Sequence, residues 1–168
     1  YPAKDFNFID AEGVSREYEY QRLSVLSKLL SGEKIIVTAS AEAVLQRTIS
    51  PDKLKRHTLI LNTTDEVSIK ELSEKLISCG YTRSDQVEGA SQFSVRGAII
   101  DIFPVQSAFP YRIELWGDEI DTISSFDTET QRRIDTVKKI TISPASEVIY
   151  DNADELVEKI SALSKSIK

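Results

Sequence analysis

The sequence predicts an α+β protein in which a partial α/β layer is joined to an antiparallel β-meander with a packing helix. Three observations support this fold class. Residues 15–47 follow the order helix, short apolar strand, helix, which is typical of an α/β layer. A helix with an apolar stripe is expected over residues 68–80. Residues 92–142 then contain short strand-like runs separated by turns, which is typical of an antiparallel meander.

The expected layer lies near the N-terminus. A helix is predicted over residues 15–30, with Ser15 as its N-cap and Gly32 as its C-terminal stop. Residues 34–40, KIIVTAS, are a short β-branched run and predict a buried strand. A short helix is expected next, over residues 41–47.

A strand and a capped helix come before the meander. The run HTLILN, residues 57–62, predicts a strand. Ser68 and Glu71 have the spacing of a capping box, so a helix is expected to begin at Ser68 and to end at Gly80. A short strand is expected at residues 81–82, directly after this helix.

The meander is expected to contain five strands, at residues 92–96, 98–103, 111–116, 119–126 and 137–142. Turns are expected at residues 104–110, at Gly117-Asp118 and around 127–135. A bulge is expected at Gly97. A last helix is predicted over residues 151–167, because Asn152 and Glu155 again have capping-box spacing.

The bulk composition argues against several classes of function. The chain has 168 residues and a formal net charge of −6, whereas proteins that grip nucleic-acid phosphates normally carry a basic face. His57 and Cys79 are the only residues of their types, so a multi-histidine metal site and an internal disulfide are excluded. The sequence contains neither common phosphate-binding glycine motif and no apolar run of membrane-spanning length. We therefore expect no catalysis, cofactor, metal or membrane contact, and a cytoplasmic location.

Two of the meander strands place charged and aromatic side chains on an outward face. In strand 111–116, one face is apolar and consists of Tyr111, Ile113 and Leu115. Arg112 and Trp116 fall on the opposite face because side chains alternate along a strand. The same alternation turns Arg96 of strand 92–96 outward. If both strands belong to one sheet, these three side chains share an exposed surface made of residue types enriched at binding hot spots.

A purely structural explanation of the same residues stays open from the pattern alone. Arg112 and Glu114 would then form a surface charge pair that contributes little to stability. Trp116 would be covered by the loop at residues 104–110 or by a helix.

The stretch VRGAIIDIFP…YRIELWGDEIDTISSFDTETQR resembles a block shared by the bacterial excision-repair protein UvrB and the transcription-repair coupling factor (Mfd). In both, a strand with R-G-x-x-[IVL]-[DE]-[IL]-F-P precedes one with R-[IVL]-[DE]-[FL]-[FW]-[GD]-[DE]-E-I-[DE]. The resemblance covers roughly residues 15–150 and is most specific over 93–133. Residues 1–8, YPAKDFNF, lack the Y-Y-x-P-E-A-Y tract of UvrB, so the sequence is identified as a fragment of the coupling factor's N-terminal UvrB-like module.

This resemblance implies a non-catalytic interaction module that binds UvrA in nucleotide excision repair. Arg96, Arg112 and Trp116 match the family's partner-binding positions, with Asp118 and Glu119 beside them as weaker candidates. The longer protein would be an ATP-dependent DNA translocase that recruits UvrA to stalled RNA polymerase. Its C-terminal domain is expected to mask the UvrA-binding surface, and RNA polymerase and DNA would be contacted only through its other domains.

The resemblance also implies a division of the chain. Residues 1–50 are expected to be a remnant of a degenerate RecA-like domain, with residues 145–168 belonging to it and packing back against it, and residues 51–144 an inserted UvrA-binding domain like domain 2 of UvrB. The alternative is a DNA-binding, helicase-derived fragment of UvrB. A small basic cluster would serve such a function: Arg132, Arg133, Lys138 and Lys139.

Overall fold

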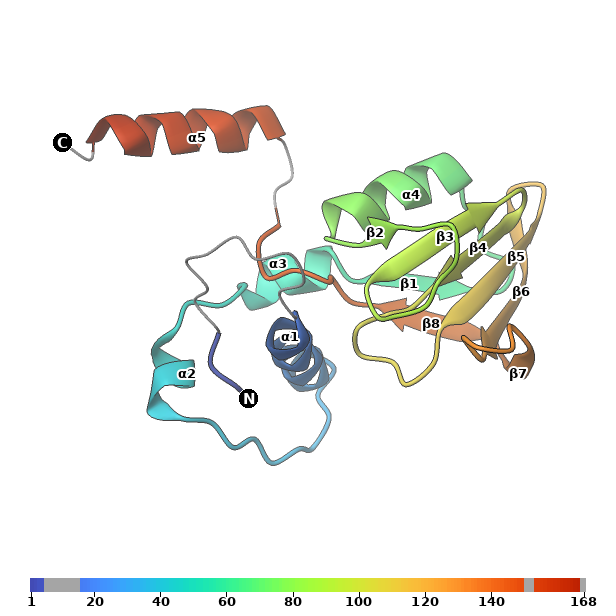
Figure 1. Cartoon of the computed structure of the whole chain (residues 1–168), viewed down its shortest axis with the longest axis horizontal. Coiled ribbons are helices and arrows are strands. Elements are labelled where there is room, and N and C mark those ends of the chain that lie inside the picture. The colour runs from blue at the N-terminus through green and yellow to red at the C-terminus, as the bar shows by residue number, and fades with distance from the viewer. Residues whose placement is uncertain (5–15, 150–152, 167–168) are drawn as a thin grey trace.

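A six-stranded sheet is the largest element of the computed structural model, which describes residues 1–4, 16–149 and 153–166 (Figure 1). Its order is β2-β3-β4-β5-β6-β7; β2 and β3 are parallel and every other neighbouring pair is antiparallel. The strands are β2 (Thr82–Arg83), β3 (Gln92–Arg96), β4 (Ile99–Ile102), β5 (Tyr111–Trp116), β6 (Glu119–Phe126) and β7 (Arg133–Val137). The predicted α+β class with an antiparallel meander is therefore confirmed.

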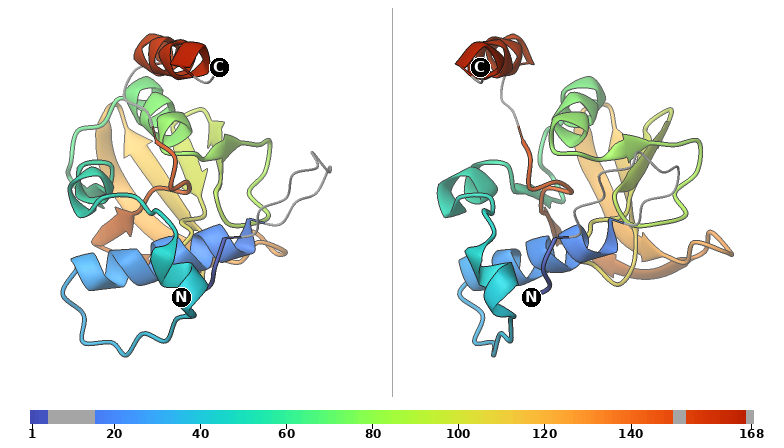
Figure 2. Two further views of the ribbon diagram at one scale, coloured as in Figure 1. Left: turned by 90° about the vertical axis from the view of Figure 1, so that its left-hand side faces the viewer. Right: turned by 60° about the vertical axis from the view of Figure 1, so that its left-hand side comes forward.

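The described chain also contains a two-stranded antiparallel sheet and five helices. The small sheet pairs β1 (Leu59–Asn62) with β8 (Lys139–Ile142). The helices of the described chain are α1 (Glu17–Leu30), α2 (Ala41–Leu45), α3 (Pro51–Arg56), α4 (Ile69–Ser78) and α5 (Ala153–Ser166). In Figure 2, α1 lies toward the lower end of the large sheet and α5 lies above its upper end.

Two tight turns fix the register of the central strands. Gly97-Ala98 joins β3 to β4, and Gly117-Asp118 joins β5 to β6. The two glycines have φ values of 61° and 63°, and glycine adopts this conformation without the steric penalty of a Cβ. The bulge expected at Gly97 is wrong, because a two-residue turn occupies that position. The register instead shifts within the β5–β6 and β6–β7 pairs.

One face of the six-stranded sheet forms the main hydrophobic core. Its buried side chains are Phe93, Ile100, Ile102, Ile113, Leu115, Ile120 and Ile123. They pack with Leu72 and Leu76 of α4 and with Leu61, Ile140 and Ile142 of the β1–β8 pair. Burying one such side chain contributes about 1.5–3 kcal/mol to folding, so this layer contact supplies much of the stability. The apolar face predicted for residues 111–116 is the one that the structure buries.

Helix α4 begins and ends where the sequence predicts. The Ser68 hydroxyl accepts a hydrogen bond from the backbone N–H of Glu71 at 3.4 Å, as in a capping box. Gly80 follows the helix with φ of 90°. The chain that returns after β8 passes so close that a Cβ on Gly80 would lie 2.7 Å from the Cβ of Ser146. Glycine is therefore required here both by backbone conformation and by space.

A smaller core joins α1 and α3 to the chain that follows β8. Its buried members are Leu23, Ile49, Leu54 and Ile149. Helix α1 ends as predicted at Gly32, whose φ of 78° permits the reversal of the chain. Both predicted N-caps of the outer helices, Ser15 and Asn152, lie outside the described residues.

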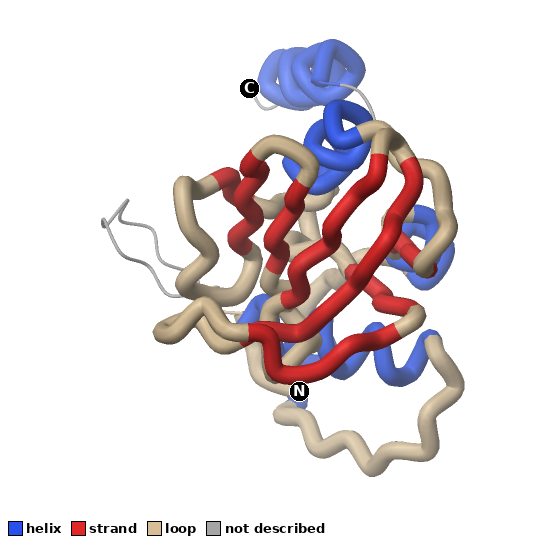
Figure 3. Tube along the Cα trace, turned by 90° about the vertical axis from the view of Figure 1, so that its right-hand side faces the viewer, coloured by secondary structure: helices blue, strands red, loops and turns tan. Residues whose placement is uncertain are grey.

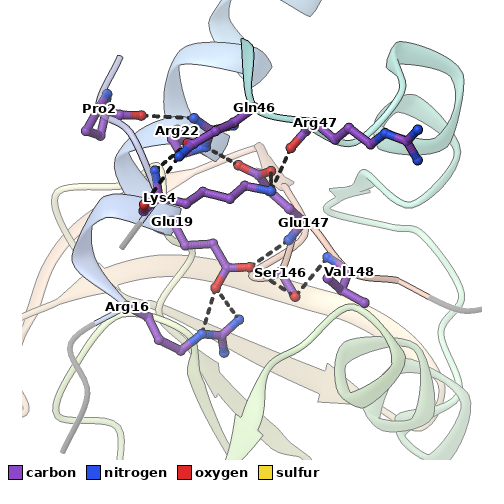
Figure 4. A network of polar contacts seen from close by, with 10 residues as sticks. All are labelled: Pro2, Lys4, Arg16, Glu19, Arg22, Gln46, Arg47, Ser146, Glu147 and Val148. Atoms are coloured by element: carbon purple, nitrogen blue, oxygen red, sulfur yellow. Dashed lines mark hydrogen bonds and ion pairs between the residues drawn. The ribbon is translucent and has the colours of Figure 1, made fainter. Parts of the chain in front are cut away.

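A network of charged side chains, of which Arg22 and Glu147 are buried, joins α1 to the same returning segment (Figure 4). Arg22 is fully buried, and its Nε lies 2.5 Å from Oε1 of Glu147. The other carboxylate oxygen of Glu147 lies 2.6 Å from Nζ of Lys4. Glu19 accepts the backbone N–H of Glu147 at 2.8 Å and pairs with Arg16 at 2.8 Å. Because removing one partner would strand a buried charge, this network fixes residues 146–147 against α1.

The strand predicted at residues 34–40 is wrong. Residues 33–40 have no regular secondary structure, and Ile36 is 97% exposed. A strand needs a neighbour to satisfy its backbone N–H and C=O groups, and the described part of the chain places none beside this segment. The short helix predicted after it is present as α2.

Three details of the C-terminal half also differ from the predictions. The region around residues 127–135, expected to be a turn, contains the start of β7. The last predicted meander strand, residues 137–142, divides between β7 and β8, and β8 pairs with β1 outside the large sheet. Residues 145–168 were expected to pack against residues 1–50; Glu147 and Ile149 do contact α1, but the side chains at 157–165 of α5 are exposed. The proposed division of the chain into two domains stays a prediction.

Replacing Gly80 by alanine is expected to destabilise the fold more than the same change at Gly32. Both glycines have positive φ, but a Cβ at position 32 would meet nothing within 4 Å. The difference therefore isolates the collision with Ser146, which we expect to cost about 1–3 kcal/mol, the usual range for overpacking. Urea unfolding of both variants measures it, and equal losses of unfolding free energy would contradict the close approach.

Candidate functional site

The second face of the six-stranded sheet carries polar side chains in register. No helix of the described chain crosses the middle of this face in Figure 3. One row runs straight across five strands and pairs Ser94, Asp101, Arg112, Ser124 and Thr136. Small hydroxyl side chains on either side of Asp101 and Arg112 leave room for a guanidinium group to lie along the sheet.

Asp101 is the centre of this polar face. Its side chain is only 2% exposed and receives two hydrogen bonds from Arg112, Nε to Oδ1 at 2.7 Å and Nη2 to Oδ2 at 2.9 Å. Arg96 reaches the same Oδ2 atom from β3, with Nη2 at 2.5 Å. The hydrogen bonds to Asp101 raise the pKa of Arg112. One buried carboxylate thus joins the two predicted arginines, and its bidentate bond is of the strong, charge-assisted type.

Arg112 is held from two further directions. Its guanidinium carbon lies 4.6 Å from the centroid of the Phe126 ring, which is completely buried. Its Nη2 donates to Oε1 of Gln131 at 3.1 Å, and its Nη1 lies 3.5 Å from the backbone oxygen of that residue. The side chain of Arg112 is 19% exposed as a result. Arg112 therefore has little freedom to change its orientation.

The loop at residues 127–132 presents Gln131 to Arg112. Oδ1 of Asp127 accepts the backbone N–H of Thr130 at 2.8 Å and its hydroxyl at 2.7 Å. The backbone N–H of Gln131 donates to the carbonyl of Asp127 at 2.8 Å. The hydrogen bonds from Thr130 lower the pKa of Asp127. These hydrogen bonds give the loop a defined conformation.

Trp116 stands at the end of β5 and is 85% exposed. Asp118 and Glu119 are exposed beside it, in the turn and at the start of β6. The turn is supported from behind, because the carbonyl of Asp118 accepts the backbone N–H of Val67 at 2.7 Å. The indole ring is thus carried by a supported turn and meets solvent.

The described structure contains neither contact of the purely structural explanation that the sequence left open. Arg112 pairs with Asp101, while Glu114 pairs with Arg133 at 2.8 Å. Neither a loop nor a helix of the described chain covers Trp116. Arg96, Arg112 and Trp116 lie on one face of the sheet by register, and their role in binding stays a prediction.

The basic cluster does not form one compact patch. Arg133 begins β7 and is engaged by Glu114, whereas Lys138 and Lys139 follow the other end of that five-residue strand. A strand rises about 3.3 Å per residue, so the two ends are roughly 15 Å apart. This arrangement gives little support to phosphate binding at these residues.

The remaining reactive side chains are structural. Burial raises the pKa of the Cys79 thiol, which disfavours the nucleophilic thiolate. Nδ1 of His57 lies 2.9 Å from the carbonyl of Lys53. Among the described residues, no group of three or more histidine, cysteine or carboxylate side chains is placed to hold a metal ion. No helix in that part of the chain has the length and apolarity to cross a membrane.

Comparison with known proteins assigns the sheet to a family. The sequence profile of the UvrB interaction domain matches residues 59–148, which is more than half of the chain. The chain belongs to the UvrB interaction domain family. The matched range begins at β1 and ends after β8, so it contains both sheets, α4 and all five candidate residues.

Similar proteins carry this domain within much longer chains. The sequence is 36% identical over 171 residues to the transcription-repair-coupling factor of Bacillus subtilis, covering 100% of this chain and 14% of that protein. It is 35% identical to the UvrABC system protein B of Methanococcoides burtonii, covering 99% of this chain and 26% of that protein. The coupling factor of Escherichia coli is 33% identical over 79% of this chain and 12% of its own length. The chain therefore spans a small part of each relative.

Sequence reasoning missed three residues of the site in this UvrB interaction domain: Asp101, Phe126 and Gln131. A usable signal existed for Asp101, which interrupts the apolar run IIDIF. A two-residue turn at Gly97-Ala98 pairs Asp101 with Ser94 and puts it on the same face as the outward arginines. No comparable signal existed for Gln131, because its contact with Arg112 depends on the conformation of a loop 19 residues further along the chain rather than on alternation.

The intrinsic fluorescence of the chain is expected to report directly on the exposure of Trp116, since it is the only tryptophan. The native chain should show red-shifted emission and nearly the same acrylamide quenching as the chain unfolded in urea, because 85% of the residue is exposed. Blue-shifted emission with weak quenching in the isolated native chain would show that the indole is covered.

Asp127 is expected to titrate below the ordinary range of an aspartate, because its ionised form accepts the hydrogen bonds from Thr130. A lowered folded-state pKa stabilises the fold above the unfolded-state pKa, and the contribution is lost as pH falls through the folded value. NMR titration of the carboxyl carbon measures the pKa. The stability difference between wild type and Asp127→Ala should shrink from neutral pH toward acid, and a difference that persists unchanged at pH below the folded pKa would contradict this role.

Proposed function

We propose that this chain is a non-catalytic protein-interaction module that binds UvrA in nucleotide excision repair, as part of a transcription-repair coupling factor. The observation that supports it most is the 85% exposure of Trp116 on the same sheet face as an ordered pair of arginines. Tryptophan and arginine are the residue types most enriched among binding hot spots.

The rigidity of the surface favours tight binding. Arg112 is fixed by Asp101 and Gln131, and Trp116 stands on a turn that is bonded to the backbone of Val67. Association costs free energy for every side chain that must be ordered, so a surface that is ordered beforehand loses less. The arginines would complement an acidic surface of the partner. Asp118 and Glu119 would lie at the rim of the binding surface of this chain.

The longer protein supplies the context of this proposal. The relatives named as coupling factors and as UvrABC system protein B support a repair function for the module. In our proposal the full-length protein is an ATP-dependent DNA translocase that recruits UvrA to stalled RNA polymerase in the cytoplasm. RNA polymerase and DNA are contacted through its other domains, and its C-terminal domain masks the UvrA-binding face. Residues 51–144 form the UvrA-binding unit, and residues 1–50 with 145–168 form the RecA-like remnant.

Trp116→Ala is expected to weaken UvrA binding by at least about 2 kcal/mol, or roughly 30-fold, as hot-spot truncations do. Isothermal titration of purified UvrA with the wild-type and variant chains measures the affinity. Ile60→Ala is a matched control, because Ile60 is a half-exposed apolar residue of β1 outside the large sheet. It should leave the affinity unchanged.

Two outcomes would contradict the proposal. One is wild-type affinity in a folded Trp116→Ala chain. The other is an absence of UvrA binding by the wild type together with binding of duplex DNA that falls steeply as salt rises, which would favour the DNA-binding alternative.

A further inference from the structure

The small sheet leaves one edge of β1 open. β1 pairs with β8 on one side, and no strand of the described chain pairs with it on the other. The backbone N–H of Thr63 donates to the carbonyl of Lys138 at 3.0 Å, which shows which residues of this pair exchange ladder hydrogen bonds. Bonded and non-bonded pairs alternate along an antiparallel ladder, so the N–H and C=O groups of Ile60 point away from β8.

Neighbouring groups agree with this direction and leave Ile60 as the open position. The carbonyl of Thr141, opposite Ile60, faces the other edge of the small sheet and accepts a hydrogen bond from Gln106 at 2.6 Å. Asn62 is occupied, because its N–H donates to the Asp65 carboxylate at 2.7 Å and its carbonyl accepts the Asp65 N–H at 3.2 Å. No group of the described residues bonds to the N–H or C=O of Ile60. An open strand edge of this kind is a template for pairing with another chain.

A groove of about 190 Å³ lies between this edge and α4. The thiol of Cys79, at the end of α4, lies 3.5 Å from the carbonyl of His57, just before β1. Helix α4 therefore runs back along β1 in the opposite direction (Figure 1). The apolar part of the groove is lined by Leu59, Leu61, Val67 and Leu72. An aliphatic side chain that enters the groove would have apolar groups of both the strand and the helix beside it.

The two ends of the groove differ in charge. Glu66 and Glu71 line the end where the chain leaves β1 and enters α4. Lys75 lines it one helical turn further along α4, toward the start of β1. All three side chains are exposed, and no ion pair within the described part of the chain engages them. A complementary occupant therefore carries a basic side chain at the first end and an acidic one at the second.

We propose that the open edge of β1 and this groove form a docking site for an extended segment of another protein. The segment adds to β1 as a short antiparallel strand, and its central residue exchanges both backbone hydrogen bonds with Ile60. Residues opposite each other across a ladder share a face, so the residues on either side of the central one place aliphatic side chains next to Leu59 and Leu61.

The charges of the groove set the order of residues in this segment. An antiparallel segment begins at the end of β1 and finishes at its start. A basic residue therefore comes first, beside Glu66 and Glu71, and an acidic residue comes last, beside Lys75. β1 belongs to the layer that covers the apolar face of the large sheet, so this site is separate from Trp116 and does not rest on the proposed function.

Proline substitution tests the open edge without a partner. Proline lacks an N–H and is tolerated where the N–H of a strand residue faces away from the ladder. Relative to alanine at the same position, Ile60→Pro should leave the urea midpoint of unfolding nearly unchanged, whereas Leu61→Pro should lower it clearly because Leu61 bonds to Ile140. An equal lowering at both positions would overturn the inference, since it would show that Ile60 bonds to β8.

Peptide titration tests the occupant. The probe is a capped peptide, Lys-Val-Thr-Val-Glu, and the matched control is the charge-exchanged peptide Glu-Val-Thr-Val-Lys. In nitrogen-15 NMR of the whole chain, the probe should shift the amide signal of Ile60 and slow its hydrogen exchange. The probe should bind at least about fivefold more tightly than the control, because its charges pair at both ends.

Variants of the chain locate the peptide. Ile60→Pro should weaken probe binding roughly tenfold, because the donor of one backbone hydrogen bond is lost. Trp116→Ala should leave probe binding unchanged, since Trp116 lies on the large sheet.

Three results would overturn the proposal. The first is the absence of any shift at Ile60 with the probe. The second is equal affinity for the probe and the charge-exchanged control. The third is a dimer of the free chain in light scattering that Ile60→Pro dissociates, because a second copy of the chain would then occupy the edge.

Discussion

The contact between the apolar face of the six-stranded sheet and the layer made by α4, β1 and β8 determines how the rest of the fold is arranged. Side chains alternate along a strand, so burying Ile113 and Leu115 on one face turns Arg112 and Trp116 to the other. The candidate surface is therefore a consequence of core formation. Its residues are placed by the backbone of a rigid sheet and do not depend on a flexible loop for their general position.

The sheet face that carries the arginines also contains a buried charge, the carboxylate of Asp101. Asp101 lies below the surface, and its cost of desolvation is offset by the bonds from Arg112 and Arg96. Phe126 and the loop that carries Gln131 complete the support of Arg112. A buried, paired carboxylate contributes less to the stability of the fold than well-packed apolar side chains would. It does, however, give the arginines fixed orientations.

A second set of charges joins the sheet to the N-terminal helix. Glu147 lies five residues after the end of β8 and contacts the fully buried Arg22 and the side chain of Lys4. Ile149, two residues later, belongs to the small core with α1 and α3. The end of the UvrB interaction domain is thus fixed to α1 by ion pairs and apolar contacts, so the sheet is connected to the preceding helix by more than its covalent link.

The sequence by itself determined the capped helix α4, most strands of the meander and the outward direction of Arg96, Arg112 and Trp116, because these follow from local alternation, capping and turn chemistry. It did not determine the fate of KIIVTAS, since a strand exists only where a neighbour pairs with it and the described chain provides none. The pairing of β8 with β1, the burial of Asp101 and the contact of Gln131 with Arg112 were decided by tertiary structure alone. Each of these three features joins residues through cross-strand register or loop packing. None of them is encoded in the periodicity of a single segment.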